Sequence, residues 1–543
     1  MPKLRYQPPD RLIGATDFSK DDALRGSLNA VRLVKSQPWA WGGLREACAA
    51  LESGYARKRE PGHWELAAVA FVTSRHVDIQ PWWDESSDDV WRECGFSEKP
   101  PYLRVWRRLR ELEQVCDEFL SAAALVIQRC RMHDERVMAH VHFDFTEDET
   151  HAALVHDCQP GDNCKRRHYK TRSGRWHSRH GHALRPPRLA TSEARKEREE
   201  WNEQDPAESV QHAAERAPEK EQPAQRGQHG RRVRVGGCWY RTRDEQAGVR
   251  AYTTGNKVRR FWHGYYSGKA IDHFTGGAIP TVDAADRQEY DLFPAFYDRV
   301  RNAIGEAPQT VIADRGFSVE SCFKHATTNG TAPVFPWRQT GSHPRHDKPT
   351  HDRHGVMRCK HCGGTMYQTR YAANNGKPRL WFRCTFQLTP DCAPEQTISC
   401  STDWRSLIPL PRTNALYHEL KESHQTYEGV HDYWRDRYRV ASDTLANRPK
   451  VVSLDWHRLR ANVACLVDWM RIAAKAGWLG SVRSARRHDG ARGFKSAGRR
   501  AAKNLAKTRA RQGLYSPYGP GAKKRGGDET PPSRRPRGAP PGA

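Results

Sequence analysis

The chain has 543 residues, enough for two to four domains, and its 90 Lys and Arg against 64 Asp and Glu give a formal charge of +26. Such an excess attracts polyanions, of which nucleic acid is the commonest, and it argues against a protein whose charges serve only solubility. No apolar run approaches the roughly 18 residues needed to span a bilayer, and the first residues lack the apolar core of a signal peptide. We therefore expect a cytoplasmic protein without a membrane partner, in which the 14 cysteines are free thiols or metal ligands rather than disulfides.

Residues 10–135 have the periodicity of helices, with apolar side chains three and four positions apart. Within this region, residues 88–96 and 97–113 predict a helix-turn-helix, with Gly95 in the turn and Pro100 and Pro101 beginning the second helix. A basic helix presented by a short turn can enter the major groove of DNA. The candidate DNA-binding residues on it are Arg104, Arg107 and Arg108. An ordinary pair of surface helices is the alternative interpretation.

The segment after the helices begins with a predicted strand. Apolar residues occupy alternate positions from Val137 to Phe143, so Asp144 lies on the opposite face of the strand from the aliphatic set. A carboxylate in the middle of such a strand faces either solvent or a cation. Asp148 and Asp157 are weaker candidates for the same role.

A charged insertion interrupts the folded part of the chain. Residues 159–232 consist largely of Arg, Lys, Glu, Gln, Pro and His with almost no aliphatic side chains, so we expect this segment to be disordered. Residues 233–284 predict an antiparallel meander, and 289–305 predict a helix. We expect 136–158 and 233–340 to form one mixed sheet across the insertion.

The stretch TVIADRGF is the focus of the functional prediction. Residues 310–313 predict a buried strand because β-branched residues favour the pleated surface, and Asp314 follows this strand directly. In open α/β sheets, ligands and catalytic groups gather at the carboxyl ends of the strands. An isolated Asp at such a position is nevertheless more often a turn former or a helix cap.

The densest cysteine cluster lies within residues 355–402, where a C-x2-C pair is followed by two glycines and then by further cysteines. The candidate ligands are Cys359, Cys362 and Cys384, with Cys392 or Cys400 as the fourth. Two thiolate pairs across a hairpin suit a tetrahedral zinc ion in a structural ribbon, and unligated thiols are the alternative. Thiolates select a different ion from the oxygen-liking magnesium, so this ribbon is not expected to be the catalytic site.

The last predicted folded block, residues 411–480, is helical and ends in an amphipathic helix that begins at LDWHRLRAN. Residues 483–543 are rich in Arg, Lys, Gly and Pro, so we expect a disordered basic tail that contacts phosphates without specificity.

This order of parts, from the strand with Asp144 to a helix that carries an acid, resembles the ribonuclease H-like core of DDE transposases from bacterial insertion sequences. Those proteins commonly place the third acid in the pattern Y-x2-R-x3-E-x6-K. Here Arg439, Asp443 and Lys450 match R-x3-D-x6-K, and four-residue spacing would place Arg439 and Asp443 on one helix face. The resemblance covers roughly residues 85–150 and 233–480.

The chain departs from the pattern of this family at three places. An Asp replaces the usual Glu, Asp436 stands at the Tyr position, and Pro449 ends the helix just before the lysine. Glu428 and Asp432 are therefore alternatives for the third acid.

The resemblance implies a fold class and a chemistry. The implied fold is an α/β ribonuclease H-like mixed sheet flanked by helices, with an N-terminal helical DNA-binding region and an inserted zinc ribbon. The implied catalytic residues and magnesium or manganese ligands are Asp144, Asp314 and Asp443, with Arg439 and Lys450 on phosphates. Two such ions activate a nucleophile and stabilise the leaving oxygen of a phosphodiester.

The implied activity is DNA transposition. Water cuts the transposon ends, and the freed 3′-hydroxyl attacks target DNA, without a covalent protein intermediate. The expected partner is double-stranded DNA, bound by a homo-oligomer associated with the nucleoid. A decayed DNA-binding protein without catalysis and a nuclease on the same core remain as alternatives.

Overall fold

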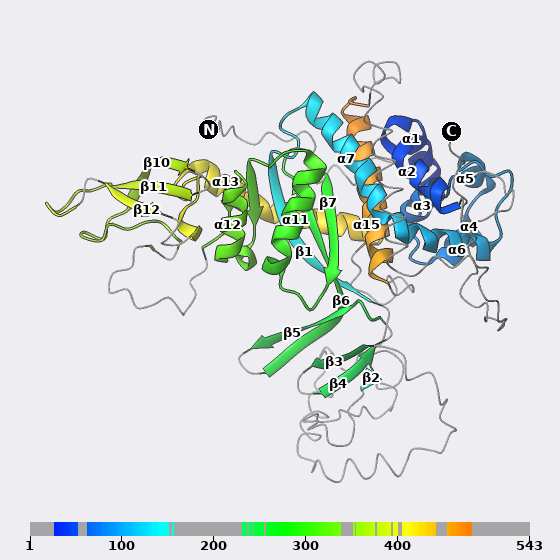
Figure 1. Ribbon diagram of the computed structural model, residues 1–543, viewed down its shortest axis with the longest axis horizontal. Helices are drawn as coiled ribbons and strands as arrows, with labels where there is room; N and C mark the ends of the chain where they lie inside the picture. Colours follow the sequence, from blue (N-terminus) through cyan, green and yellow to red (C-terminus); the bar gives the residue numbers. More distant parts are fainter. Residues whose placement is uncertain are drawn as a thin grey trace, which may run out of the picture.

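The computed structural model shows a central mixed sheet with an N-terminal group of helices at one end and a small cysteine-containing sheet at the other (Figure 1). The structure describes residues 26–52, 62–150, 155–156, 231–337, 351–399, 404–440 and 453–479, apart from 236–237, 243, 255–256, 353, 375–376 and 393–394. The predicted basic tail lies outside these residues, and so does the predicted disordered insertion except for its last two residues, 231 and 232. The short described pair 155–156 comes just before the insertion.

The central sheet joins strands from both sides of the long insertion. Its strands are β1 (His140–Glu149), β5 (Gly248–Thr254), β6 (Lys257–Asp272), β7 (Ala278–Ala284), β8 (Thr310–Ala313) and β9 (Ala332–Val334). β6 pairs antiparallel with β1, β5 and β7, whereas β8 lies parallel to both β1 and β9. The predicted mixed sheet does contain Asp144 and the strand before Asp314, but the expectation that all of 136–158 and 233–340 form it is wrong, because residues 155–156, 231–235 and 238–242 pair in a separate three-stranded sheet.

Two helices connect the parallel strands and cover the apolar face of β1. α11 (Glu289–Ile304) lies between β7 and β8 in the chain, and α12 (Glu320–Thr328) lies between β8 and β9. Phe143 is fully buried, and its ring packs 4.8 Å from that of Phe296 on α11. The predicted alternation therefore holds, because Phe143 faces α11 while Asp144 points to the other side of the sheet.

The other face of the sheet is covered by C-terminal helices. This part contains α13 (Ala415–Ser423), α14 (Glu428–Tyr438) and α15 (Leu454–Lys475). We expected an amphipathic α15, but it is buried nearly all round, because it lies between β7, α7 (Cys116–His133) and the N-terminal helices. Even Arg460 is only 2% exposed, and its guanidinium donates to the carbonyl oxygen of Tyr438 at 2.9 Å.

The N-terminal region is helical, as predicted. Besides α7 it contains α1 (Ser27–Lys35), α2 (Pro38–Glu52), α3 (Trp64–Thr73), α4 (Ile79–Glu85), α5 (Asp88–Glu93) and α6 (Tyr102–Glu111), and the 3-10 turn η2 (Leu112–Val115) leads into α7. Trp91 on α5 is fully buried against Trp82, with 5.3 Å between the ring centroids. Gly95 follows α5 with a φ of 84°, a left-handed conformation that glycine adopts without strain.

Two small three-stranded sheets lie outside the central one. β10 (Met366–Asn374), β11 (Lys377–Cys384) and β12 (Gln396–Ser399) form the sheet of the cysteine-rich segment, and β2 (Val155–His156), β3 (Arg231–Val235) and β4 (Cys238–Thr242) form the other. No helix in the described part of the chain has the length and apolar character that crossing a bilayer requires.

Candidate functional site

Asp144 and Asp314 lie next to each other on neighbouring strands. In the parallel pairing of β1 with β8, Phe143 is opposite Ala313, so the two aspartates follow at the same level. Asp314 comes directly after the buried strand, where its carboxylate caps the turn η4 (Arg315–Phe317) by accepting from the Gly316 N–H at 2.7 Å. The interpretation of Asp314 as a cap is confirmed, and the same residue also lies beside a second carboxylate.

The close spacing of the two carboxylates affects their protonation. Asp314 reaches solvent, but desolvation by the surrounding protein and the negative charge of Asp144 raise its pKa. Burial opposes ionisation of Asp144, yet contact with His431 and the charge of His424 outweigh it and lower the pKa of Asp144. A cation between the two carboxylates would relieve their repulsion.

A buried lysine lies opposite Asp144. Lys269 on β6 is the cross-strand partner of Asp144, and its side chain is fully buried on the same face of the sheet. Lys269 Nζ lies 2.9 Å from His431 Nδ1, and His431 Nε2 lies 3.2 Å from Asp144 Oδ2. Asp144 therefore lies partly in solvent and on the face of the sheet that carries Lys269, and His431 connects the two side chains.

Burial sets the charge states along this chain of contacts. It lowers the pKa of Lys269 to about 7, although the negative charge of Asp144 acts in the opposite direction. Burial and the positive charge of Lys269 also lower the pKa of His431 to about 4. His431 is therefore neutral at pH 7, with Nδ1 accepting from the Lys269 ammonium and Nε2–H directed at Asp144.

Further histidines line the same face of β1. His142 is fully buried, with Nε2 2.9 Å from His273 Nδ1 and Nδ1 3.2 Å from His424 Nδ1. His142 also stacks on Tyr427 with 4.1 Å between ring centroids, and Tyr427 donates to the His273 carbonyl oxygen. These contacts hold the turn η6 (His424–Tyr427), and hence the start of α14, against the sheet beside Asp144.

An additional acid lies near Asp314. A Cβ placed on Gly316 would lie 2.9 Å from Asp314 Oδ1 and 3.0 Å from Glu289 Oε2. The glycine of TVIADRGF therefore leaves room for both carboxylates.

The residues assigned to the third acid are only partly described. Asp443 and Lys450 lie outside the described residues. The expectation that Arg439 and Asp443 share one helix is wrong, because α14 ends at Tyr438 and Arg439 follows in a left-handed conformation with φ 53°. Its Nε donates to the Arg75 carbonyl oxygen at 3.3 Å, and this contact fixes Arg439 to the N-terminal helices.

The remaining acidic candidates have different surroundings. Asp148 is buried and its Oδ2 lies 2.7 Å from His457 Nδ1, so it supports packing of α15 on β1. Asp432 on α14 is exposed and pairs with Arg435 at 3.0 Å. Glu428 is the first residue of α14, three positions before His431. Asp157 is outside the described residues.

The predicted DNA-binding arginines of α6 do not share one environment. Arg107 is exposed, whereas Arg108 is buried and pairs with Glu111 at 2.5 Å. The Arg104 guanidinium lies 5.6 Å from the ring centroid of Trp64. Only Arg107 of the three is placed to reach a partner without rearrangement.

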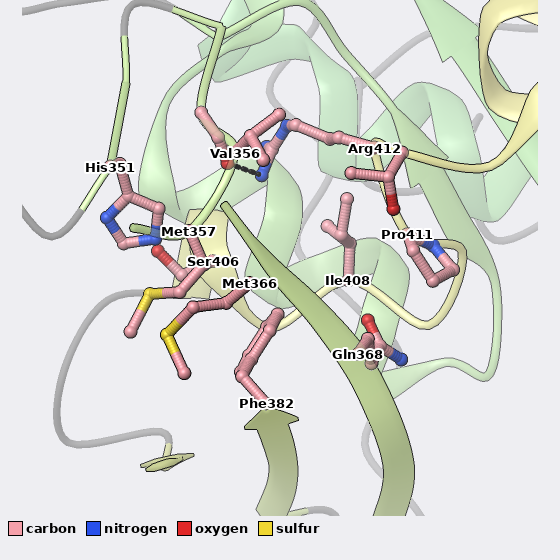
Figure 2. A pocket seen from close by; sticks show the side chains of 12 residues that line it. His351, Val356, Met357, Met366, Gln368, Phe382, Ser406, Ile408, Pro411 and Arg412 are labelled. Carbon is pink, nitrogen blue, oxygen red and sulfur yellow. Dashed lines mark hydrogen bonds between the residues drawn. The ribbon is translucent and has the colours of Figure 1, made fainter. Parts of the chain in front are cut away.

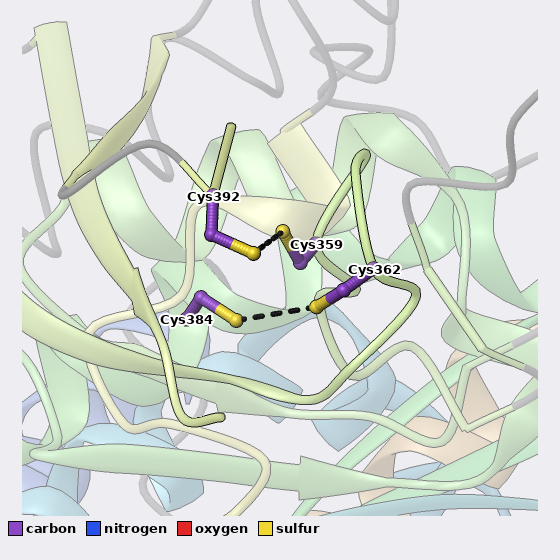
Figure 3. A group of neighbouring side chains, drawn as sticks. All are labelled: Cys359, Cys362, Cys384 and Cys392. Atoms are coloured by element: carbon purple, nitrogen blue, oxygen red, sulfur yellow. Dashed lines mark hydrogen bonds between the residues drawn. The ribbon is translucent and has the colours of Figure 1, made fainter. Parts of the chain in front are cut away.

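Four cysteines come together in the C-terminal half of the chain (Figure 3). The ligand atoms of Cys359, Cys362, Cys384 and Cys392 all lie within 4.8 Å of one another. Cys362 and Cys384 Sγ are 3.5 Å apart, and Cys359 and Cys392 Sγ are 4.0 Å apart. Zn–S bonds of about 2.3 Å in a tetrahedron place sulfurs about 3.8 Å apart, so this cluster can hold zinc. Of the two candidates for the fourth ligand, Cys392 belongs to this cluster, and Cys400 lies outside the described residues.

Backbone amides point at these sulfurs, as thiolates require. The Gly364 N–H donates to Cys362 Sγ, and the Gln387 N–H donates to Cys384 Sγ, each at 3.4 Å. Hydrogen bonds from the hydroxyl and backbone of Thr389 lower the pKa of Cys392 to about 7. Although the Gly364 N–H favours the thiolate, the pKa of Cys362 is instead raised to about 11, with burial and its contact with Cys384 opposing ionisation. The four sulfurs and their donors can therefore hold a thiophilic metal ion.

A small cavity lies beside the sheet of β10, β11 and β12, which we call the ribbon sheet (Figure 2). Met357, Met366, Phe382 and Ile408 line it together with Arg412, whose guanidinium donates to the Gly355 carbonyl oxygen at 3.3 Å. Its volume of about 20 Å³ holds about one water, so it is a packing feature between the ribbon and residues 404–413.

Sequence reasoning missed Lys269, His424, His431 and Glu289 as neighbours of the two aspartates. Lys269 carried a usable signal, since a lysine within the run YYSGKAID stands in a strand that is otherwise buried. The histidines on η6 and α14 carried none, because their position depends on how the last helices fold back onto the sheet.

A scan against protein-family models and a search of curated proteins found no match to this chain.

Proposed function

We propose that this protein is a metal-dependent DNA transposase of the DDE type with a ribonuclease H-like core. One observation supports the proposal above the others, namely that Asp144 on β1 and Asp314 directly after β8 follow the paired residues Phe143 and Ala313 of two neighbouring strands. The chain order supports it further, because β1, the antiparallel meander, α11 and β8 follow one another as the resemblance requires.

The chemistry follows from the charges at this edge. The two carboxylates would hold Mg²⁺ or Mn²⁺, which activates water or a 3′-hydroxyl for attack on a phosphodiester. Asp144 is ionised and fixed by His431, while Asp314 retains access to solvent and to a substrate phosphate. Lys269, whose pKa of about 7 leaves it partly protonated at neutral pH, contacts His431 rather than Asp144, so it acts on this carboxylate through the histidine and leaves its open side free.

DNA as the partner is supported by the outer face of the ribbon sheet. Trp381 on β11 has the guanidinium of Arg370 3.8 Å from its ring centroid and that of Arg379 at 6.0 Å. Both arginines are exposed, and neither forms an ion pair with an acid among the described residues. Exposed arginines beside an aromatic ring suit a polyanion that carries flat bases. The formal charge of +26 acts in the same direction.

The test is cleavage of labelled DNA that carries the flanking ends of the gene, with magnesium or manganese added. Asp144→Ala and Asp314→Ala should abolish cutting, and Asp89→Ala, at an exposed acid on α5, should leave it unchanged. Parallel variants at Asp443, Glu428 and Asp432 identify the third acid. Strand-transfer joints among the products distinguish a transposase from a nuclease, and cutting that survives Asp314→Ala contradicts the proposal.

A second candidate is a non-catalytic DNA-binding protein derived from such an enzyme. It is favoured by the end of α14 at Tyr438, which separates Arg439 from the helix that the family pattern requires. This candidate predicts equal DNA binding, and no cutting, by the wild type and Asp314→Ala.

A further inference from the structure

A cavity of about 600 Å³ with a mixed polar and apolar lining lies between the N-terminal helices and the end of α14. It is lined by the start of α1, the residues after α3, the segment joining α4 to α5, and Arg437. The described residues thus place a helix N-terminus and a buried guanidinium in one cavity.

The start of α1 is arranged to receive an anion. Gly26 precedes the helix and, having no side chain, provides no cap, and the first turn contains no acidic residue. α1 has nine residues, and its first residues line the cavity, where the helix dipole places a partial positive charge. Helix termini in proteins are usually capped by a side chain or occupied by a ligand.

Arg437 is the independent observation that points to a ligand. Its side chain is only 7% exposed, it lines the cavity, and its Nη2 has no hydrogen-bond partner within the described part of the chain. A buried guanidinium nitrogen without an acceptor is costly, because it has lost water without gaining a hydrogen bond. Burial and the positive charges of Arg471 and Arg75 lower the pKa of Arg437, so nearby charges repel it rather than neutralise it.

The other charges around the cavity leave a positive balance. Arg75 is exposed, lines the cavity and pairs with no acid among the described residues. Glu85, the acid in the lining, already pairs with His76 at 3.0 Å. The hydroxyls of Ser27, Ser74 and Ser87 add neutral donors.

We infer that this cavity is a phosphate-binding site, in which Arg437, Arg75 and the backbone amides at the start of α1 hold the oxygens of one phosphate group. The phosphate belongs either to a nucleic-acid backbone or to a free phosphate or nucleotide. The inference does not rest on the proposed function, because none of these groups contacts Asp144 or Asp314.

The first experiment measures thermal unfolding of the full chain against inorganic phosphate at constant ionic strength, with no divalent metal added. The wild type should show a saturable rise in Tm of about 2 °C or more. Arg437→Gln and Ser27→Asp should lose this response. An acid at the start of α1 favours the helix while repelling phosphate, so a Tm of Ser27→Asp at or above that of the wild type shows that the loss is not misfolding.

The matched control is Arg92→Gln, because Arg92 is an exposed arginine on α5 that pairs with Asp89 outside the cavity. It should keep the phosphate response. An equal rise of Tm in all four proteins would reflect the general stabilising effect of phosphate on folded proteins and would overturn the inference.

The second experiment identifies the source of the phosphate by measuring the affinity for short duplex DNA against NaCl concentration. If the site takes a backbone phosphate, Arg75→Gln should reduce the slope of log K against log[salt] by about 1, whereas Arg92→Gln should not. If the slope is unchanged while the phosphate response is lost in Arg437→Gln, the ligand is a free phosphate or nucleotide.

Discussion

At the scale of residues, Lys269 is the side chain that most changes how the site is understood. A carboxylate at position 144 was predicted from the alternation along β1, but its partner comes from a strand 125 positions later through the register Asp144↔Lys269. Sequence alternation gives the face on which a residue lies. It does not give the residue across the sheet, because register is a long-range property.

The buried lysine predicts a pH dependence of stability. The pKa of Lys269 is lowered to about 7 in the folded protein, whereas lysine in an unfolded chain titrates near 10.4. Between these values the unfolded state binds more protons, so the free energy of unfolding should rise with pH, by at most about 1.4 kcal/mol per unit from this group. Urea unfolding at pH 7, 8 and 9 measures this rise.

Lys269→Met should remove this contribution, because methionine fills the space without a titrating group. Lys324→Met, at an exposed position on α12, serves as the control and should keep the rise. The same pH slope in the wild type and in Lys269→Met would show that Lys269 is not the group responsible.

At the scale of elements, local patterns predicted the strand Thr310–Ala313, the helix that became α11, and the antiparallel meander. Each depends on residues close in sequence, such as the β-branched run before Asp314. The end of α14 was not predicted. The buried guanidinium of Arg460 donates there to the carbonyl oxygens of Arg439 and Tyr438, which lie 21 and 22 positions earlier in the chain, and Arg439 leaves the helical conformation. Tertiary contacts thus override a spacing that would suit a helix.

Close packing of α15 on the β6–β7 turn gives a prediction for glycine. A Cβ at Gly277 would lie 2.6 Å from Ile472 Cδ1 and 2.8 Å from the ring of Trp469, whose indole N–H is held by the Ala278 carbonyl oxygen. Gly277→Ala should therefore lower the free energy of unfolding by about 1–3 kcal/mol, measured by urea unfolding. Gly429→Ala, in α14 with nothing within 4 Å, should instead raise it by up to about 1 kcal/mol. Equal effects of the two changes would contradict this account.

The cysteine ribbon is the element whose folding we expect to depend on metal. Purified protein should contain one zinc per chain, and Cys384→Ser should lose it, because three thiolates hold zinc less well than four. Elemental analysis measures the metal, and limited proteolysis should show cleavage within residues 351–399 in the variant. Cys400→Ser is the control and should retain zinc. If Cys400→Ser loses the metal while Cys392→Ser retains it, the fourth ligand has been assigned wrongly.

At the scale of the whole molecule, positively charged features are spread over several parts of the chain. Arg107 lies on α6, Arg370 and Arg379 lie on the ribbon face, and Arg75 and Arg437 line the cavity beside α1. The formal charge of +26 predicted a polyanionic partner from composition alone. Composition could not predict which arginines are exposed, and the burial of Arg108 and Arg460 shows that many are used for packing.

The ribbon face gives a prediction that separates directed contacts from the general charge. Each phosphate contact contributes about 0.9 to the slope of log K against log[salt] for duplex DNA. Arg370→Gln combined with Arg379→Gln should therefore reduce this slope by about 2 if both side chains contact phosphates. Trp381→Ala should weaken binding to single-stranded DNA more than to duplex, because the half-buried ring and the arginine over it can stack with unpaired bases. Arg92→Gln loses one positive charge away from the ribbon and should change neither quantity. An unchanged slope in the double variant would remove the ribbon from the DNA interface and leave the partner to be sought at α6 and at the cavity beside α1.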